Sequence, residues 1–289
     1  YVGRILNANP KNILLEFTAT IDLSNPNIHD KYKDKIIYQY DLKQFRLDKY
    51  SKEIEVLQAD FDSIDRALQA VILSQYRRKI AEKHKIKLKP VILFKSNYVN
   101  PPKQREENKI VSKEFKDKFL NKIKNLHTED VDKFRESQSG TIQEAFEYFD
   151  ANEITTENLI REIQNDFEET KCLSVDSNED KERNQVLVNS LEAKDNEIRA
   201  VFAVEMLNEG WDVLNLFDIV RLYNTRDARE GRPGKTTMSE AQLIGRGARY
   251  FPFQLDAAQD KYKRKFDEDV DNKLRILEQL FYHSAYNVK

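Results

Sequence analysis

The sequence predicts an α/β fold in which helices flank a mostly parallel β-sheet. Short apolar runs of strand length alternate along the chain with longer segments whose apolar residues recur at helical spacing. Several of these runs are apolar at almost every position, which is typical of parallel strands covered on both faces. The length of 289 residues corresponds to about two domains, and a hydrophobic content of 39% suffices for a packed core.

The N-terminal part of the chain is expected to contain two strands joined by a linker. Residues 13–17 (ILLEF) form an apolar run that predicts a buried strand. Residues 24–34 are polar and rich in turn formers, so we expect a linker there. Residues 35–46 are rich in β-formers and partly alternate in polarity, which predicts the second strand.

A long helix and a buried strand are expected next. Residues 61–84 show a helical period through Phe61, Ile64, Leu68 and Val71. Residues 90–94 (PVILF) follow and predict a buried parallel strand. After a polar connection at 100–112, helical patterns are expected over 113–126, 141–150 and 156–169.

The C-terminal part alternates again between strands and helices. We expect a short strand at 171–175, a helix at 185–193 and strands at 198–204 and 217–222. A polar loop at 226–237 precedes a helix over 239–249. Val270, Leu274, Leu277 and Phe281 have helical spacing and predict an amphipathic helix over 267–282.

Composition excludes several classes of protein. Lys and Arg number 48 and Asp and Glu 50, so the formal charge of -2 excludes a histone-like polybasic protein. One cysteine, Cys172, excludes an internal disulfide or a multi-cysteine zinc site and suits a reducing compartment, so we expect a cytoplasmic protein. Since no apolar run approaches about 18 residues, no membrane span is expected. The chain has no initiator methionine, and we expect it to be part of a longer protein.

Glycine marks one region of the sequence as a candidate site. The chain has only seven glycines, and five of them lie within residues 210–247, together with the single tryptophan, Trp211. Glycine occurs where the backbone turns tightly or approaches a ligand. The alternative is that this is simply the loop-rich part of the fold.

Two arginines at helical spacing carry the clearest chemical signal in this region. Arg246 and Arg249 are three residues apart, and a helix would place them on one face. Guanidinium groups bind phosphate oxygens in pairs of hydrogen bonds, and Gly245 beside them suggests a close approach of backbone to ligand. The alternatives are surface ion pairs for the arginines and a helix-capping role for Gln242 within residues 239–242.

Three strand ends carry further candidates. Gly210 and Asp212 follow the strand at 198–204, where a ligand of a parallel sheet binds, although a tight turn with a capping aspartate explains them equally. Thr18 and Thr20 end the first apolar run and have hydroxyls that can bridge two domains. Lys95 and Ser96 end the strand at 90–94 and suit contacts with a phosphate backbone.

Basic residues also form two clusters, at 77–89 and 261–265, which are either solvated surface or contacts to a phosphate backbone. Residues 231–236 end like a P-loop, but Arg229 stands where the first glycine of that motif is required. The stretch is therefore not a Walker A site.

Taken in order, these segments resemble the C-terminal half of a superfamily 2 helicase motor. Residues 17–20 resemble motif III, residues 91–96 motif IV, residues 203–213 motif V, and residues 242–249 the Q-x-x-G-R-x-x-R pattern of motif VI. The amino-acid sequences of residues 245–253 and 262–267 most resemble the Res subunit of type III restriction enzymes. One departure is the absence of the threonine that often stands near Val204 in motif V.

The resemblance implies a RecA-like architecture and a division of the chain. Residues 1–23 would be the end of a first RecA-like domain and residues 24–34 a linker. Residues 35–255 would be the second RecA-like domain, with a helical insertion at about 103–170, and residues 256–289 a helical extension. A nuclease domain would follow residue 289.

The resemblance also implies roles for the candidate residues. Arg246 and Arg249 would reach the phosphates of ATP, with Arg249 as the arginine finger, and Gln242 would support them. Gly210, Asp212 and Gly245 would line the nucleotide side, Lys95 and Ser96 would face the DNA backbone, and Thr18 and Thr20 would couple the two domains. The Walker A motif and the residues that bind Mg²⁺ would belong to the first RecA-like domain of the same polypeptide. A modification methyltransferase subunit is the expected protein partner.

Two other functions remain open at this stage. The chain is alternatively a non-catalytic nucleic-acid-binding or scaffold module with a helicase-like fold, or half of an RNA helicase. On its own, without the Walker A domain, the chain is expected to be inactive in ATP hydrolysis.

Overall fold

The computed structural model divides the chain into two compact units, residues 1–48 and 49–289. The structure describes residues 2–17, 21, 23, 25–58, 61–97, 111–136, 140–175, 181–204, 213–223 and 235–285. Of residues 2, 181–182 and 235–239 it describes the backbone alone.

The first unit contains three short helices and no buried residue among its described positions 3–17 and 25–48. The helices are α1 (Val2–Ala8), α2 (Pro26–Tyr32) and α3 (Leu42–Leu47). The predicted strand at 13–17 is wrong, because these residues have no regular secondary structure and Phe17 is 91% exposed. The predicted strand at 35–46 is also wrong, since α3 begins inside it behind the N-cap Asp41. Pro26 at the start of α2 favours a helix in the predicted linker.

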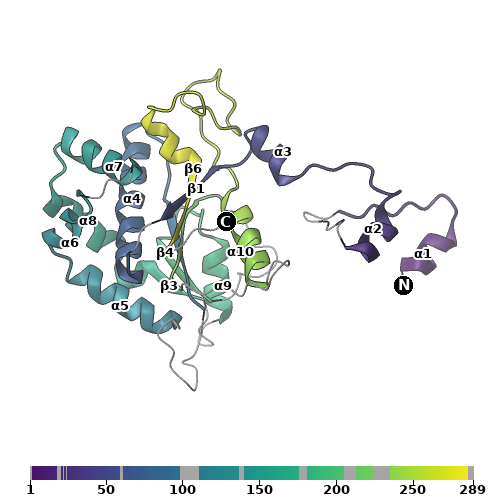
Figure 1. The fold of residues 1–289 in the computed structure, drawn as a ribbon, viewed down its shortest axis with the longest axis horizontal. Coiled ribbons are helices and arrows are strands. Elements are labelled where there is room, and N and C mark those ends of the chain that lie inside the picture. The colour runs from purple at the N-terminus through teal and green to yellow at the C-terminus, as the bar shows by residue number, and fades with distance from the viewer. Residues whose placement is uncertain are drawn as a thin grey trace. The chain divides into compact units, whose positions relative to one another are not determined.

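The second unit is built on a six-stranded sheet in which every neighbouring pair is parallel (Figure 1). The strand order is β1-β6-β5-β2-β4-β3. The strands are β1 (Glu53–Gln58), β2 (Val91–Lys95), β3 (Cys172–Ser174), β4 (Ala200–Ala203), β5 (Leu216–Arg221) and β6 (Gln279–Ser284).

Helices cover both faces of this sheet, as Figure 1 shows. One face carries α4 (Ser63–Lys83) and α5 (Ser112–Lys124), and α6 (Thr128–Asp132), α7 (Gly140–Ala151) and α8 (Thr156–Asp166) pack beside them. The other face carries α9 (Lys181–Asn189) and α10 (Lys235–Gly247). Two short 3-10 helices, at Glu169–Lys171 and Lys273–Glu278, precede β3 and β6.

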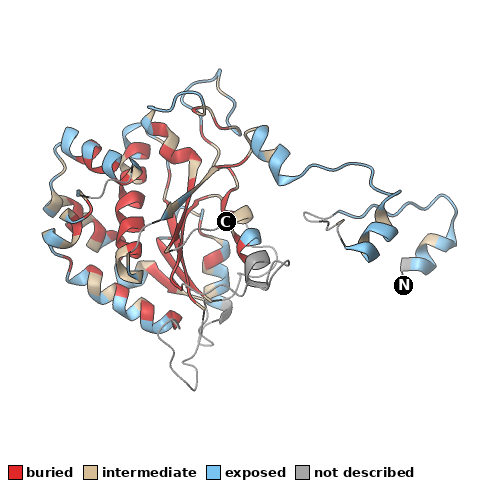
Figure 2. Ribbon diagram, viewed as in Figure 1, coloured by how far each residue is buried: buried red, intermediate tan, exposed pale blue. Residues whose placement is uncertain are grey.

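The side chains of the central strands β2 and β4 alternate between two hydrophobic cores. In β2, Ile92 and Phe94 pack with the residues of α4 and α5, whereas Val91 and Leu93 pack with those of α9 and α10. This alternation follows from the period of two in a β-strand. Figure 2 shows the result, with buried residues concentrated in the strands and along α4.

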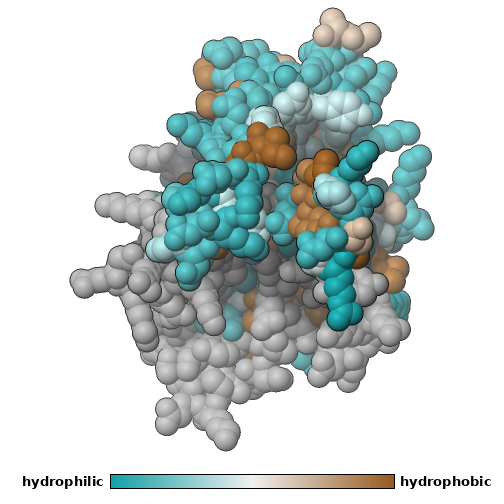
Figure 3. Space-filling view, turned by 90° about the vertical axis from the view of Figure 1, so that its right-hand side faces the viewer, coloured by the Kyte–Doolittle hydropathy of each residue, from teal (hydrophilic) through white to brown (hydrophobic). Residues whose placement is uncertain are grey.

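The face of the molecule in Figure 3 is mainly hydrophilic where its residues are described. In Figure 3, hydrophobic side chains form small separate patches among hydrophilic ones. This agrees with a charged-residue content of 34%.

The predicted fold class is confirmed, because the sheet is parallel and is flanked by helices. Helices α4, α5, α7 and α8 and strands β2, β4 and β5 lie where the sequence predicts them. The helix predicted over 267–282 is wrong. Its residues instead form the 3-10 helix at 273–278 and strand β6, which pairs with both β1 and β5. Residues 256–289 therefore lie in the same compact unit as the rest of the sheet.

Candidate functional site

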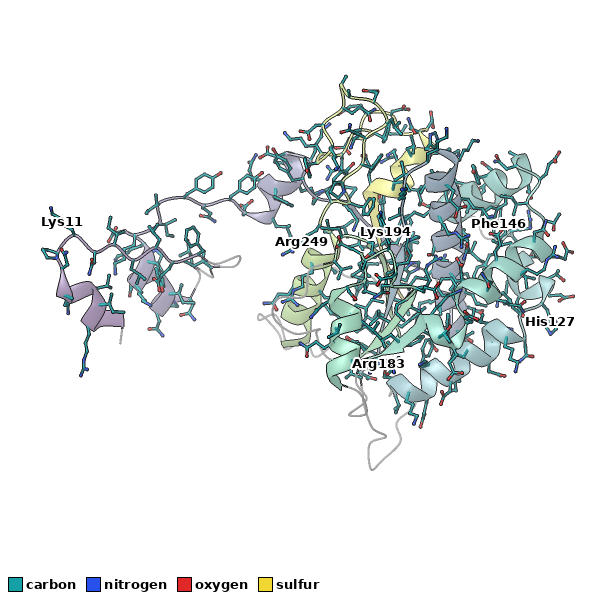
Figure 4. The ribbon with its side chains drawn as sticks, turned by 180° about the vertical axis from the view of Figure 1, so that it is seen from behind. Lys11, His127, Phe146, Arg183, Lys194 and Arg249 are labelled. Carbon is teal, nitrogen blue, oxygen red and sulfur yellow. The ribbon has the colours of Figure 1, made fainter. Side chains whose placement is uncertain are left out.

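Arg246 and Arg249 lie at the C-terminal end of helix α10. The backbone N–H of Arg249 donates to the carbonyl of Arg246 over 3.3 Å, so the chain continues in a turn beyond the helix. Both residues are half-buried, and Figure 4 shows Arg249 beside the end of this helix. The structure thus brings the two arginines together within one turn, with part of each residue exposed to solvent.

This end of α10 lies at the amino-terminal edge of the sheet. Near the start of the helix, the Glu240 carboxylate lies 3.3 Å from Nε of Arg221, the last residue of β5. At the end of the helix, Gly247 packs against Leu216, the first residue of β5. Helix α10 is therefore antiparallel to β5, and both arginines lie beside the starts of the strands.

The two glycines beside the arginines have different surroundings. A Cβ atom at Gly247 would lie 3.2 Å from side-chain carbons of Leu216 and Leu280, so glycine lets the helix approach β5 and β6 closely. A Cβ atom at Gly245 would meet nothing within 4 Å among the described residues. The space at Gly245 is compatible with the close approach of a ligand that the sequence predicts there.

Gln242 is exposed on α10, one turn before Arg246. The helix begins at Lys235, so residue 239 lies inside it and is not its N-cap. The capping role considered for Gln242 therefore does not apply, and its amide remains available to support a ligand.

Four of the predicted site residues lie outside the described part of the chain. These are Thr18, Thr20, Gly210 and Asp212. The first described residue after Asp212 is the buried Val213, followed by Leu214. The backbone N–H of Leu214 donates to the Glu192 carboxylate over 2.7 Å.

Lys95 and Ser96 lie at the opposite, carboxyl-terminal edge of the sheet. Lys95 is 7% exposed, and its amine donates to the Val204 carbonyl over 2.9 Å. Ser96 is fully buried, and its backbone N–H donates to the Ala203 carbonyl. Both side chains are buried in this conformation. Their direct contact with a DNA backbone stays a prediction, and it requires a conformation in which both side chains are exposed.

A buried polar group at this edge was not found from the sequence. Glu240 accepts a hydrogen bond from the Tyr223 hydroxyl over 2.8 Å and pairs with Arg221. Burial and the neighbouring Glu240 raise the pKa of Tyr223, so the phenol remains protonated. The sequence shows Arg221 as a basic residue at the end of an apolar strand, but its partner Glu240 lies 19 positions further along the chain.

The first basic cluster is largely internal rather than a solvated face. Arg77 is fully buried against Asp218, Arg78 pairs with Asp166 and Glu82, and Lys79 lies 2.6 Å from Glu162. Lys89 donates to the Asn196 side chain and carbonyl. Burial lowers the pKa of Lys89 to about 8. These residues join structural elements, while Lys83, Lys85 and Lys87 remain exposed.

The second basic cluster also has structural roles. Arg264 is buried and donates to the Asp267 carboxylate and to the Ser51 carbonyl. Lys265 donates to the Tyr250 hydroxyl, which in turn donates to Glu278. Residues 245–253 and 262–267, whose sequences resemble those of Res subunits, thus contact each other next to Arg249.

The described residues offer little for a metal ion or a membrane. Among them, no group of three or more His, Cys, Asp or Glu side chains is placed to hold a metal ion. No helix of the described part is long and apolar enough to cross a bilayer. The described features that suit phosphate oxygens are two half-buried arginines, Arg246 and Arg249, and the space at Gly245.

Comparisons with known proteins found two relatives and one family. The chain is 35% identical over 234 residues to the probable type III restriction-modification enzyme HindVIP Res subunit of Haemophilus influenzae, covering 75% of this chain and 44% of that protein. It is 60% identical over 48 residues to an uncharacterized protein of the same organism, covering 17% of this chain and 10% of that protein. A family described as the HI_1054 N-terminal region matches residues 236–289. The chain spans less than half the length of these curated relatives, and no solved structure matches.

Proposed function

Because this chain contains a helicase-related domain of the Res type, we propose that it is part of an ATP-driven motor and completes a nucleotide site with Arg246 and Arg249. The other wall of this site, with the Walker A motif and the residues that hold Mg²⁺, belongs to a first RecA-like domain of the same polypeptide. The activity of the whole protein, its DNA substrate and a methyltransferase partner are part of the proposal, as is a cytoplasmic location.

The observation that carries the proposal is the placement of the two arginines. They lie within one turn, at the end of a helix whose position is fixed by Gly247 and Glu240. Guanidinium groups held on a rigid element stabilise the charge that develops on a transferred phosphoryl group without rearranging during the reaction. Part of each residue is exposed, so the pair can meet a phosphate supplied from another domain.

In this proposal, each candidate residue of the chain contacts a different part of ATP. Arg249 contacts the γ-phosphate as the arginine finger, and Arg246 binds the adjoining phosphate oxygens. Gln242 and Gly245 lie three residues apart on α10 and would support the phosphates, and the resemblance assigns Gly210 and Asp212 to the nucleotide side as well. Bound Mg²⁺ supplies charge neutralisation of the phosphates, and its ligands lie on the first domain.

DNA would be bound on the opposite edge of the sheet. Lys95 ends β2 there and Ser96 follows it, and both are buried, with the Lys95 amine bonded to the Val204 carbonyl just after β4. In this proposal, the nucleotide and the DNA bind at opposite ends of the same strands. A motor needs such a connection between its two ligands, and rigid strands supply one.

The test is the substitution Arg249→Ala in the full-length protein that contains this chain. DNA-stimulated ATP hydrolysis should fall by at least about 10³-fold, as for other arginine fingers. The melting temperature should stay within about 2 °C of the parent value, because the side chain is only half-buried. The matched control is Arg161→Ala, which removes an exposed arginine on α8 and should leave turnover unchanged.

Unchanged turnover in Arg249→Ala would contradict the assignment. Comparing duplex DNA, single-stranded DNA and RNA as stimulators separates a DNA motor from an RNA helicase. Nucleic-acid binding with no ATP hydrolysis in the intact parent protein would identify the non-catalytic module instead.

A further inference from the structure

Lys52 is a fully buried lysine whose amine makes three hydrogen bonds. It lies one residue before β1, and its Nζ atom donates to the carbonyls of Leu214, Leu216 and Gly247 over 2.8, 2.7 and 2.9 Å. The same atom lies 4.2 Å from the centre of the Phe217 ring, which also attracts a cation.

Gly247 lies within residues 242–249, and Leu214 and Leu216 directly follow residues 203–213, the two segments that resemble motifs VI and V. Gly247 stands between Arg246 and Arg249 at the end of α10, and Leu214 follows Asp212 by two positions. The backbone of Lys52 adds a further bond, since its N–H donates to the Ala248 carbonyl over 2.6 Å. The next residue back, Ser51, forms an antiparallel bridge with Arg249.

The geometry requires the charged form of this lysine. An ammonium group has three N–H donors, and a neutral amine has two, so only the ammonium satisfies all three carbonyls. Burial and the nearby Arg77 lower the pKa of Lys52, while Glu192 and Asp218 oppose that lowering. The carbonyls at the C-terminal end of α10 carry partial negative charge and favour a cation there.

We propose that Lys52 is a positioning residue, which fixes the arginine-bearing end of α10 relative to the segment that follows Asp212. This inference rests on the proposed function, because it assigns Lys52 a role in ATP hydrolysis through Arg246 and Arg249. Lys52 does not itself reach the nucleotide, since it is enclosed by backbone. Loss of the Lys52 amine removes the hydrogen-bond donor that both segments share. The end of α10 and the residues that follow Asp212 can then move independently of each other.

The experiment is a double-mutant cycle in the full-length protein with Lys52→Met and Arg246→Lys. Lys52→Met alone should lower kcat/KM for ATP at saturating DNA by at least about 10-fold, because small displacements of positioned groups are costly in catalysis. In the Arg246→Lys background, where the arginine fork is already lost, the same change should cost less than about 3-fold. The control Lys79→Met removes a half-buried lysine that pairs with Glu162 on the other side of the sheet, and it should leave kcat/KM unchanged in both backgrounds.

A merely structural role gives a different result. If Lys52→Met only reduces the folded fraction, kcat/KM falls by the same factor with and without Arg246→Lys, and that outcome overturns the inference. If Lys52→Met does not fold, the same cycle is run with Lys52→Arg, which keeps the buried charge. Its flat fork cannot direct three donors onto these carbonyls, so a several-fold loss and the same coupling are expected. Parental activity of Lys52→Arg also overturns the inference.

The failure of this inference is distinct from the failure of the proposed function. If Arg249→Ala and Arg246→Lys leave turnover unchanged, the nucleotide site itself is wrongly assigned. If both arginine variants lose turnover while Lys52 shows no coupling to Arg246, only the role of Lys52 fails.

Discussion

Nη1 of Arg77 lies 2.6 Å from Oδ2 of Asp218, and neither side chain has any exposure. The pair joins α4 to the middle of β5, and the His283 ring of β6 lies 3.1 Å from the other Asp218 oxygen. The Arg77 guanidinium also lies over the rings of Phe217 and Phe281. A charge in the core is thus surrounded by a carboxylate and by aromatic faces, and it ties three elements of the sheet unit together.

We therefore expect Arg77→Met to destabilise the chain by about 3–5 kcal/mol, because it leaves Asp218 buried with its main counter-charge removed. The measurement is the free energy of unfolding in urea. The control is Arg161→Met, which removes an exposed arginine on α8 and should cost less than about 1 kcal/mol. Similar losses in the two variants would contradict a special role of the buried pair.

The two glycines of α10 give a matched pair of substitutions. Gly245→Ala should raise the unfolding free energy by up to about 1 kcal/mol, because alanine is the better helix former and the added methyl meets no described atom within 4 Å. Gly247→Ala should lower it by about 1–2 kcal/mol, since its methyl would press on Leu216 and Leu280 at 3.2 Å. Thermal unfolding of both variants checks the opposite signs.

The Gly245→Ala variant also tests the proposed nucleotide site. If ATP approaches α10 at Gly245, the stabilised Gly245→Ala variant of the full-length protein should bind ATP more weakly, by about 10-fold or more. An unchanged ATP affinity would place the nucleotide away from this face of the helix.

Asp166 makes the fold sensitive to acid. Burial alone would raise the pKa of this carboxylate, but the charge of Arg199 and hydrogen bonds from Gln75 and Arg78 hold the pKa below its ordinary value of 3.8. A carboxylate with a lower pKa in the folded state stabilises the fold above about pH 4, and this contribution disappears as the pH falls through the folded-state pKa. Asp166→Asn should therefore cost about 1.5–3 kcal/mol at pH 7 and less than about 1 kcal/mol near pH 2.

Urea unfolding of the parent and of Asp166→Asn between pH 2 and pH 7 provides the measurement. Asp150→Asn, which changes an exposed aspartate paired with Arg135, is measured in parallel as the control. A cost of Asp166→Asn that stays constant down to pH 2 would contradict this role of Asp166.

The sequence was most informative where periodicity and burial agree. The predicted helix over 61–84 is confirmed as Ser63–Lys83, because its apolar residues pack against the sheet along its length. The helix predicted over 267–282 fails because Leu274, Leu277 and Phe281 have helical spacing by chance. Strand β6 needs apolar residues on both faces, since Leu280 and Phe281 belong to different cores. Position within a sheet overrides local periodicity there.

Strand β1 was missed for the converse reason. Its sequence, EIEVLQ, is half polar, and the strand pairs only with β6 at the edge of the sheet.

The site was predicted only in part. The arginines of α10 were visible as a pattern, but Lys52 reaches Gly247 across 195 positions, and no local signal marks such a contact.

The burial of Lys95 leads to the last prediction, on DNA binding. Each lysine that neutralises a phosphate contributes about 0.9 to the slope of log K against log salt concentration for duplex DNA. The Lys95 amine is bonded to the Val204 carbonyl and is 7% exposed. Lys95→Met in the full-length protein should therefore lower the melting temperature by several degrees and leave the salt slope of DNA binding unchanged within about 0.3. A slope reduced by about 0.9 would show instead that Lys95 leaves Val204 and contacts a phosphate. Lys124→Met, an exposed lysine at the end of α5, is the control for an unspecific charge effect.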